Sequence, residues 1–362
     1  MSSLRVACAA VLTLALPGAA FADAAVAEGG PDFFEPVMLG QLWITAWDQD
    51  RDPQADPAGY GDPEDDPGFK IRRARLGAQG DLGKGFGYEV VFGAESPYDV
   101  WSEGDTDIQL VDANVGWKKG AFGVTVGQQK VPYSLEQLMS AGELIYTERA
   151  VATAHMAPGR ETGLMADYSW KGLGVQAGLF NGSGSFLGDD NIGFLSAGRL
   201  SYTLGSAEAA RKTWGKVDGL VLSAGANGYY NDDLSTGTLC LGGDVLVRAA
   251  GLAVLLEGHH ANLKPTHTDV AAPDVLDGTP RLGLTGQVGY SLGAFENAVR
   301  FSLFDDNTEV EDNGDVWELY GGTTVHLIDD HARLGVGYIH RHEMAGQTLP
   351  NETIRLWVQG KY

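Results

Sequence analysis

Apolar and polar residues alternate over short segments along most of the chain, and this alternation limits the fold more than any other feature. In the last segment, 353–362, Ile354 and Leu356 share one face, while Arg355 and Gln359 share the other. A period of two residues is that of a β-strand, whose successive side chains point to opposite faces. One such strand fits a wall between lipid and water, and equally a soluble sheet.

The alternation recurs in sixteen segments, each about as long as a tilted strand that crosses a hydrocarbon layer. The predicted strands are 37–47, 69–81, 85–95, 107–118, 121–130, 162–170, 172–181, 194–205, 218–230, 239–250, 252–262, 282–293, 295–304, 316–327, 332–342 and 353–362. Most turns after even-numbered strands are short, and long loops follow odd-numbered strands, although the turn at 206–217 is longer than expected. This asymmetry predicts an all-β fold, a closed transmembrane antiparallel β-barrel with short periplasmic turns and long extracellular loops.

Aromatic residues on the apolar face fall at two levels of these strands. Those near the short-turn end are Phe86, Trp117, Phe122, Trp170, Phe295 and Tyr362. Those near the long-loop end are Tyr230, Trp317 and Tyr338. Two aromatic girdles are expected at the two interfaces of a membrane, whereas a soluble β core does not predict this sorting.

The first residues have the pattern of a signal peptide. Arg5 precedes the apolar stretch Val6 to Leu16, and Ala20-Phe21-Ala22 supplies the small residues at which signal peptidase cuts. The apolar stretch is too short to span a bilayer as a helix. We therefore expect residues 1–22 to be removed on export, 23–36 to form a periplasmic segment, and 37–362 to form a barrel in a bacterial outer membrane.

Five stretches of the chain carry motifs of a known family. They are FKIRRARL at 69–76, GQQKVPYSLE at 127–136, ERA at 148–150, APGRETG at 157–163 and GLFNGSG at 178–184. In these stretches the chain resembles the phosphate-selective porins O and P of Gram-negative bacteria. The resemblance implies a sixteen-stranded, homotrimeric channel whose third loop folds into the lumen as a constriction.

The segment 131–161 is the candidate constriction loop. A long connection in a barrel of short ones is usually a lid, a plug or a binding element. Pro132 and Pro158 stiffen its two ends. Its ionisable residues would project towards the pore, unless the segment is an exposed surface loop; they are Glu136, Glu143, Glu148, Arg149, His155, Arg160 and Glu161.

Basic residues on the inner face and in this loop are the candidate pore and anion-binding residues. They are Arg73, Arg75, Lys130, Arg149, Arg160, Arg199, Arg248, Arg300, Arg333 and Arg355, and the alternation also places Arg341 inside. A row of permanently charged guanidinium groups offers an anion successive weak sites. Acids share this face and could instead pair with the arginines and brace the wall; they are Asp81, Glu89, Asp112, Asp167, Asp244, Glu257 and Glu318. Because the basic residues near the constriction only slightly outnumber the acids, and lysines are few, we expect weak to moderate anion preference.

Most of the acidity lies in predicted extracellular loops. The formal net charge of −23 argues against a nucleic-acid partner. Acidic residues cluster in 48–66 and in 305–315. They could bind divalent cations that bridge lipopolysaccharide, although a merely solvated loop is the simpler explanation.

Other functions remain open at this stage. A general or cation-tolerant porin would share every feature above. A barrel lipase needs a serine and a histidine in hydrogen-bond reach, but His259 and His260 point to opposite faces, and no Gly-x-Ser-x-Gly elbow is present. A structural or adhesin barrel has nothing specific in its favour. We expect a passive channel for small inorganic or organic anions, in contact with outer-membrane lipid and lipopolysaccharide, that catalyses no reaction and needs no cofactor or metal.

Overall fold

A computed structural model describes the chain at residues 32–47, 68–95, 108–185, 193–233, 236–265, 278–312, 314–328, 330–346, 348 and 351–362. The predicted signal peptide, most of the predicted periplasmic segment and the acidic segment 48–66 lie outside these residues.

Sixteen strands are present in the described residues, as the alternation predicts. They are β1 (Glu35–Trp47), β2 (Gly68–Gly83), β3 (Phe86–Glu95), β4 (Ile108–Lys119), β5 (Phe122–Lys130), β6 (Arg160–Trp170), β7 (Leu173–Phe180), β8 (Leu195–Leu204), β9 (Val217–Asp232), β10 (Thr236–Ala250), β11 (Leu252–Pro265), β12 (Thr279–Leu292), β13 (Phe295–Asp305), β14 (Val316–Ile328), β15 (Ala332–Glu343) and β16 (Asn351–Lys361). Each begins and ends within about three residues of its predicted bounds, because the alternation is a local property of the sequence.

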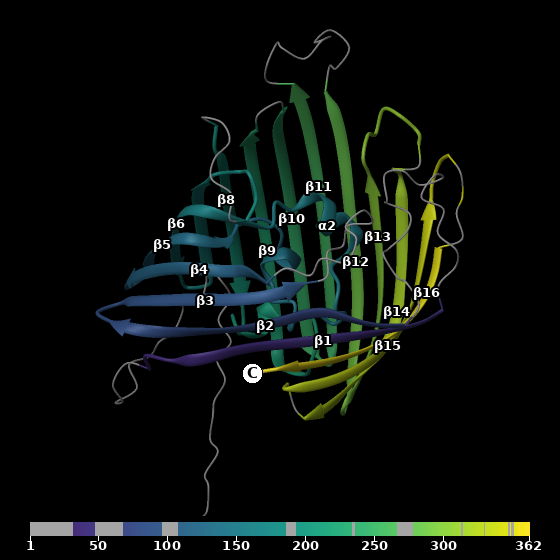
Figure 1. Cartoon of the computed structure of the whole chain (residues 1–362), viewed down its shortest axis with the longest axis horizontal. Helices are drawn as coiled ribbons and strands as arrows, with labels where there is room; N and C mark the ends of the chain where they lie inside the picture. Colours follow the sequence, from purple (N-terminus) through teal and green to yellow (C-terminus); the bar gives the residue numbers. More distant parts are fainter. Residues whose placement is uncertain are drawn as a thin grey trace, which may run out of the picture.

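The strands pair in chain order, and β1 pairs with both β2 and β16, so the sheet closes into a barrel. In the closing pair Gln41 lies opposite Gln359, and Leu42 lies opposite Val358. Figure 1 shows β1 lying beside the yellow C-terminal strands. Closure gives every backbone group of the wall a partner strand, which a sheet in lipid requires. The predicted closed antiparallel barrel is confirmed.

The two faces of the wall differ as the alternation predicts. On β16, Ile354 and Val358 are 36% and 39% exposed, whereas Arg355 and Gln359 are only 2% and 1% exposed. The outer face is therefore apolar and suits lipid, and the inner face is polar. The inner side chains are buried because other parts of the chain fill much of the lumen.

Residues 131–159 join β5 to β6 and lie against the inner wall; we call them the third loop. They contain two short helices, α1 (Leu135–Leu138) and α2 (Val151–Met156), and α2 packs against β12 and β13 (Figure 1). Because β6 begins at Arg160, the loop ends two residues earlier than predicted, and Arg160 and Glu161 belong to the wall. Among the described residues, no helix has the length and apolar character needed to cross a membrane.

The long turn between β8 and β9, residues 205–216, also enters the lumen. It contains the 3-10 helix η1 (Ala209–Arg211), and its Trp214 is only 4% exposed. The third loop bonds directly to it, since the Ile145 backbone N–H donates to Thr213 Oγ1 over 2.9 Å. Residues 205–216 are longer than the other short turns because they fold into the lumen, where they line the inner wall at the short-turn end.

Candidate functional site

The centre of the third loop is held by a carboxylate between two neighbouring arginines. Glu148 Oε1 lies 2.8 Å from Arg72 Nε and 2.7 Å from Arg73 Nη1. The Arg73 Nη1 group also donates to the Thr147 carbonyl at 2.7 Å. Burial alone would raise the pKa of Glu148, but the charges of Arg72 and Arg73 hold it at about 2. Glu148 therefore stays ionised and ties the loop to β2 at any physiological pH.

Arg72 was not predicted to face inwards, because the simple alternation places it opposite to Arg73. The register between β1 and β2 shifts at this point: Gln41 pairs with Arg73, but Leu42 pairs with Ile71. The extra residue of such a bulge re-aims the side chains around it. As a result both arginines are buried, at 6% and 3% exposure, and both reach the same carboxylate.

A second anchor joins α1 to β11. The Glu136 backbone N–H and the Ser134 hydroxyl each donate to the Glu257 carboxylate over 2.9 Å. Glu136 in turn accepts from the Ala150 backbone N–H, and its Oε1 lies 3.5 Å from Arg300 Nη1. Burial, only partly offset by Arg300, raises the pKa of Glu136. These contacts fold the two ends of the loop against each other.

Three predicted arginines on the C-terminal wall bind the backbone or the aromatic rings beneath the loop. Arg300 Nη1 donates to the Glu148 carbonyl at 2.7 Å, while its Nη2 donates to Glu318 at 3.0 Å. Arg333 donates to the carbonyls of Leu144 and Gly142 at 3.0 and 2.9 Å. The Arg355 guanidinium lies 3.7 Å from the centre of the Trp43 ring. All three are buried; Arg300 and Arg333 bond to the loop directly, whereas Arg355 stacks on Trp43, whose Nε1 donates to Thr147 of the loop.

Two more predicted arginines are paired within the wall or with the inner turn. Arg199 forms two hydrogen bonds to Asp244, of 2.5 and 2.7 Å. Arg248 donates to the carbonyls of Ala209, Trp214 and Gly215 in the turn 205–216. Asp244 is therefore one of the acids that brace the wall, and Arg248 fastens the turn.

The four remaining candidates, Arg75, Lys130, Arg149 and Arg160, gather on the other side of the lumen. Lys130 and Arg160 are direct cross-strand partners on β5 and β6. Lys130 Nζ and Arg149 Nη2 both donate to the Met139 carbonyl, at 2.7 and 3.0 Å. Burial and the charges of Arg73, Arg160 and Arg75 lower the pKa of Arg149 to about 10, so it remains protonated at neutral pH.

Arg75 approaches this group because the neighbouring strand has no side chain in its way. Its cross-strand partner on β3 is Gly93, and a Cβ added there would lie 3.1 Å from Arg75 Cγ. Arg160 is neutralised in part by Asp112, with two hydrogen bonds of 2.9 Å. Arg75, Arg149 and Arg160 are partly exposed, unlike the arginines under the loop. We call Arg75, Lys130, Arg149 and Arg160 the basic cluster.

His259, beneath the third loop, contributes to packing between the loop and the barrel wall. His259 Nδ1 shares a 2.8 Å hydrogen bond with the Tyr133 hydroxyl, which also lies 3.0 Å from Cys240 Sγ. Ser134, which follows Tyr133 in the chain, donates to Glu257 rather than to the histidine. His259, Tyr133 and Cys240 are all buried, so this group packs the loop against β10 and β11.

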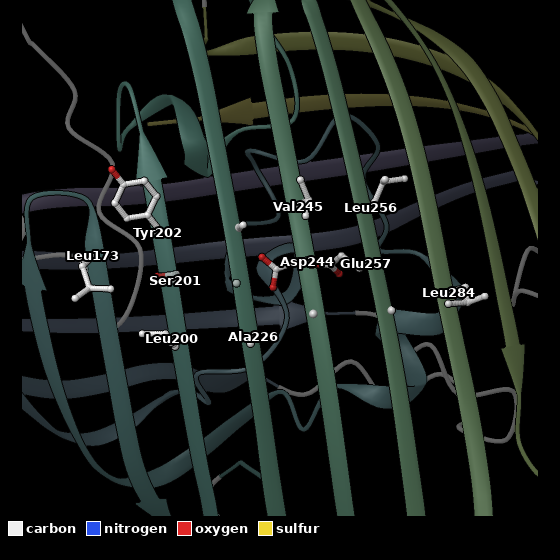
Figure 2. A pocket seen from close by; sticks show the side chains of 14 residues that line it. Leu173, Leu200, Ser201, Tyr202, Ala226, Asp244, Val245, Leu256, Glu257 and Leu284 are labelled. Carbon is white, nitrogen blue, oxygen red and sulfur yellow. The ribbon is translucent and has the colours of Figure 1, made fainter.

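A shallow hollow on the wall faces away from the lumen. It spans β7 to β12, and its rim includes Leu200, Tyr202, Val245, Leu256 and Leu284 (Figure 2). These side chains belong to the exposed, apolar face of the barrel. The hollow therefore suits the hydrocarbon of a membrane rather than a hydrophilic solute.

Comparison with known proteins yields a family, a relative and several similar structures. The model of a family described as phosphate-selective porin O and P matches residues 48–242. A Caulobacter vibrioides protein described as uncharacterized is 32% identical over 144 residues, which are 37% of this chain and 27% of that protein. The match therefore spans about a quarter of the relative's length.

Two solved structures illustrate the similarity of fold. The anion-selective porin from Comamonas acidovorans has a TM-score of 0.60 at 12% identity, covering 92% of this chain and 99% of that one. The trimer form of OmpT, an outer membrane protein of Vibrio cholerae, has a TM-score of 0.54 at 10% identity, covering 91% and 100%. At these identities the likeness concerns the barrel itself.

Proposed function

The chain belongs to the phosphate-selective porin O and P family, and from this premise we propose a passive outer-membrane channel for small hydrophilic solutes with weak to moderate anion preference. The family and the closed barrel support an outer-membrane channel for small solutes rather than an enzyme. The preference for anions is the further step, and it rests on the charges inside the lumen.

The observation that carries this step is the convergence of the basic cluster. Its four basic side chains come from four different elements, namely β2, β5, the third loop and β6. Asp112 and Glu89 are the acids of the same wall, Asp112 pairs with Arg160, and the charge of Glu136 in the third loop acts on Arg149. Four basic side chains thus face three acidic ones, which favours anions without forming a deep, selective phosphate site.

The position of these charges decides their weight against the net charge of −23. Charge on an exposed loop acts through water and is screened over about 8–10 Å at physiological salt. Charge in a narrow and partly desolvated lumen acts at a lower effective dielectric and is felt several times more strongly. The basic cluster should therefore outweigh the acidic loops.

The test is to measure the reversal potential of single channels in a planar bilayer that separates two different salt concentrations. Replacing Arg75 and Arg160 by Ala should shift this potential towards cation selectivity. The matched control, Ala at Asp62, Asp65 and Asp66, removes three charges from the acidic segment and should change it little at physiological salt. The opposite ranking would overturn the anion assignment, and an absence of conductance steps would overturn the channel itself.

A general or cation-tolerant porin is the second candidate, and the acids of the wall favour it. Asp112 neutralises Arg160 in part, and Lys130 and Arg149 donate to backbone carbonyls of the third loop. Such a channel would show a reversal potential near zero that the Arg75/Arg160 variant scarcely changes.

We also propose that the protein assembles as a homotrimer. The apolar outer face, including Leu164, Val288 and Val299, offers wall surface that can pack against a second barrel or contact outer-membrane lipid and lipopolysaccharide. The Vibrio cholerae protein of similar fold has a trimer form. Native mass measurement in mild detergent should give three chains, and a uniform single-chain mass would refute the trimer.

A further inference from the structure

The connection between β13 and β14 brings three aspartates together at the long-loop end of the barrel. Asp306, Asp312 and Asp315 each offer a carboxylate oxygen, and these oxygens all lie within 4.8 Å of one another. The loop has six acidic residues between 305 and 315 and no basic one. A cluster of acids in a solvated loop would spread its charges apart, whereas these three converge.

The barrel wall fixes this loop on both sides. The Thr308 backbone N–H donates to the Pro280 carbonyl at 2.9 Å, and Arg281 Nε donates to the Asp306 carbonyl at 3.1 Å. On the other side, the Met344 backbone N–H donates to the Asp315 carbonyl at 2.7 Å. The three carboxylates are therefore held close together by β12 and the end of β15 rather than by a chance loop conformation.

Two of the carboxylate oxygens are buried without a hydrogen-bond donor. Asp315 is only 5% exposed, and its Oδ1 has no partner; Asp306 Oδ1 is in the same position. Arg281, the nearby cation, donates to a backbone carbonyl rather than to a carboxylate. An ionised oxygen buried without a partner is costly, so this arrangement calls for a cation between the aspartates.

The three carboxylates are like charges held close together, and a bound cation would remove the repulsion between them.

We propose that Asp306, Asp312 and Asp315 bind one calcium ion at the extracellular mouth of the barrel. Calcium accepts six to eight oxygen ligands at about 2.3–2.6 Å in flexible geometry, so its ligand oxygens can be as far apart as these. Magnesium requires a tighter octahedron and keeps most of its water, and it fits the site less well. Three carboxylates in an extracellular loop suit a dissociation constant on the order of 0.1–1 mM. This inference does not depend on the anion preference proposed above.

The experiment compares two pairs of substitutions in the same loop of the purified, folded protein. The variant Asp306→Asn/Asp315→Asn removes two ligands, while Glu309→Gln/Glu311→Gln removes two exposed charges outside the cluster. Calcium binding measured by equilibrium dialysis should weaken about ten-fold or more in the first variant and remain within two-fold of wild type in the second. Calcium bound elsewhere, for example by the acidic segment 48–66, is common to all three proteins and cancels.

Thermal unfolding separates a ligand site from a merely structural one. Without calcium, Asp306→Asn/Asp315→Asn should melt at a higher temperature than wild type, because repulsion between carboxylates is relieved. With 5 mM calcium the order should reverse, since only wild type and Glu309→Gln/Glu311→Gln gain stability from the ion. Equal weakening of binding in both variants, or no calcium-dependent rise in the wild-type melting temperature, would overturn the proposal.

Discussion

The inner wall of the barrel has a covered region and an open region, although both carry arginines at the same alternating positions. In the covered region, under the third loop and the turn 205–216, Arg248, Arg300, Arg333 and Arg355 are at most 2% exposed. In the open region, Arg75 and Arg160 remain partly exposed beside Lys130 and Arg149. The same residue type thus braces the lumen on one side and is partly open to solvent on the other.

The two regions differ because the covered arginines face the backbone of the third loop. The third loop has two short helices and little other regular structure, so many of its carbonyls lack a backbone donor. A guanidinium offers five N–H donors in a fixed plane and can satisfy several carbonyls at once, as Arg333 does for Gly142 and Leu144. Arginine under the loop therefore replaces the hydrogen bonds that secondary structure would have supplied.

The largest effect on the covered region is expected from removing the ion pair of Glu148 with Arg72 and Arg73, which holds the third loop. Glu148→Gln leaves Arg72 and Arg73 without their carboxylate in a buried setting, which costs about 3–5 kcal/mol of unfolding free energy. We expect denaturant unfolding to show this loss and single-channel currents to become larger and noisier. Glu208→Gln, which removes an exposed charge 3.9 Å from Lys212, is the control and should have almost no effect. Unchanged stability in Glu148→Gln would mean that the loop is held elsewhere.

A smaller effect should follow from separating the inner turn from the third loop. Thr213→Val keeps the volume of the side chain but removes the hydroxyl that accepts from the Ile145 N–H. A buried N–H left without an acceptor costs about 1–3 kcal/mol. Thr323→Val, which removes a hydroxyl bonded to Asn297 at an exposed position, is the matched control and should change the free energy of unfolding by less than about 0.5 kcal/mol. Equal losses in the two variants would show that the turn does not support the loop.

The smallest effect is expected from a change of pH. It tests, without a mutation, whether the Glu148 ion pair keeps the third loop in place over the covered region. The pKa of Glu148 is about 2 in the folded protein, below its ordinary value of 4.5. Its contribution to stability is therefore fully present above the ordinary pKa and is lost as the pH falls towards and through 2. Conductance and current noise of wild-type channels should accordingly stay constant between pH 7 and pH 5. An increase in conductance at pH 5 would indicate that the loop is released by a different titrating group.

The sequence determined the strands, their number and, apart from Arg72 at a bulge, which basic residues of the wall face inwards. Alternation within about ten residues is enough for this, because the apolar face must meet lipid whatever the rest of the chain does. It also placed Lys130 and Arg160 at the two ends of the long connection 131–161, although Arg160 was expected in the loop and its cross-strand pairing with Lys130 came from the structure. Residues at the two ends of one loop were therefore within reach of sequence reasoning, and their exact pairing was not.

Only the tertiary structure decided which arginines are covered. The bonds between Arg333 and the third loop join residues 189 and 191 positions apart, and no local pattern encodes such a contact. The inward turn of Arg72 depends on a bulge against β1, and the entry of Trp214 into the lumen had only the length of its turn as a signal. Periodicity is set by neighbours in the chain, whereas the docking of a loop depends on complementary donors and acceptors that the closed barrel alone brings together.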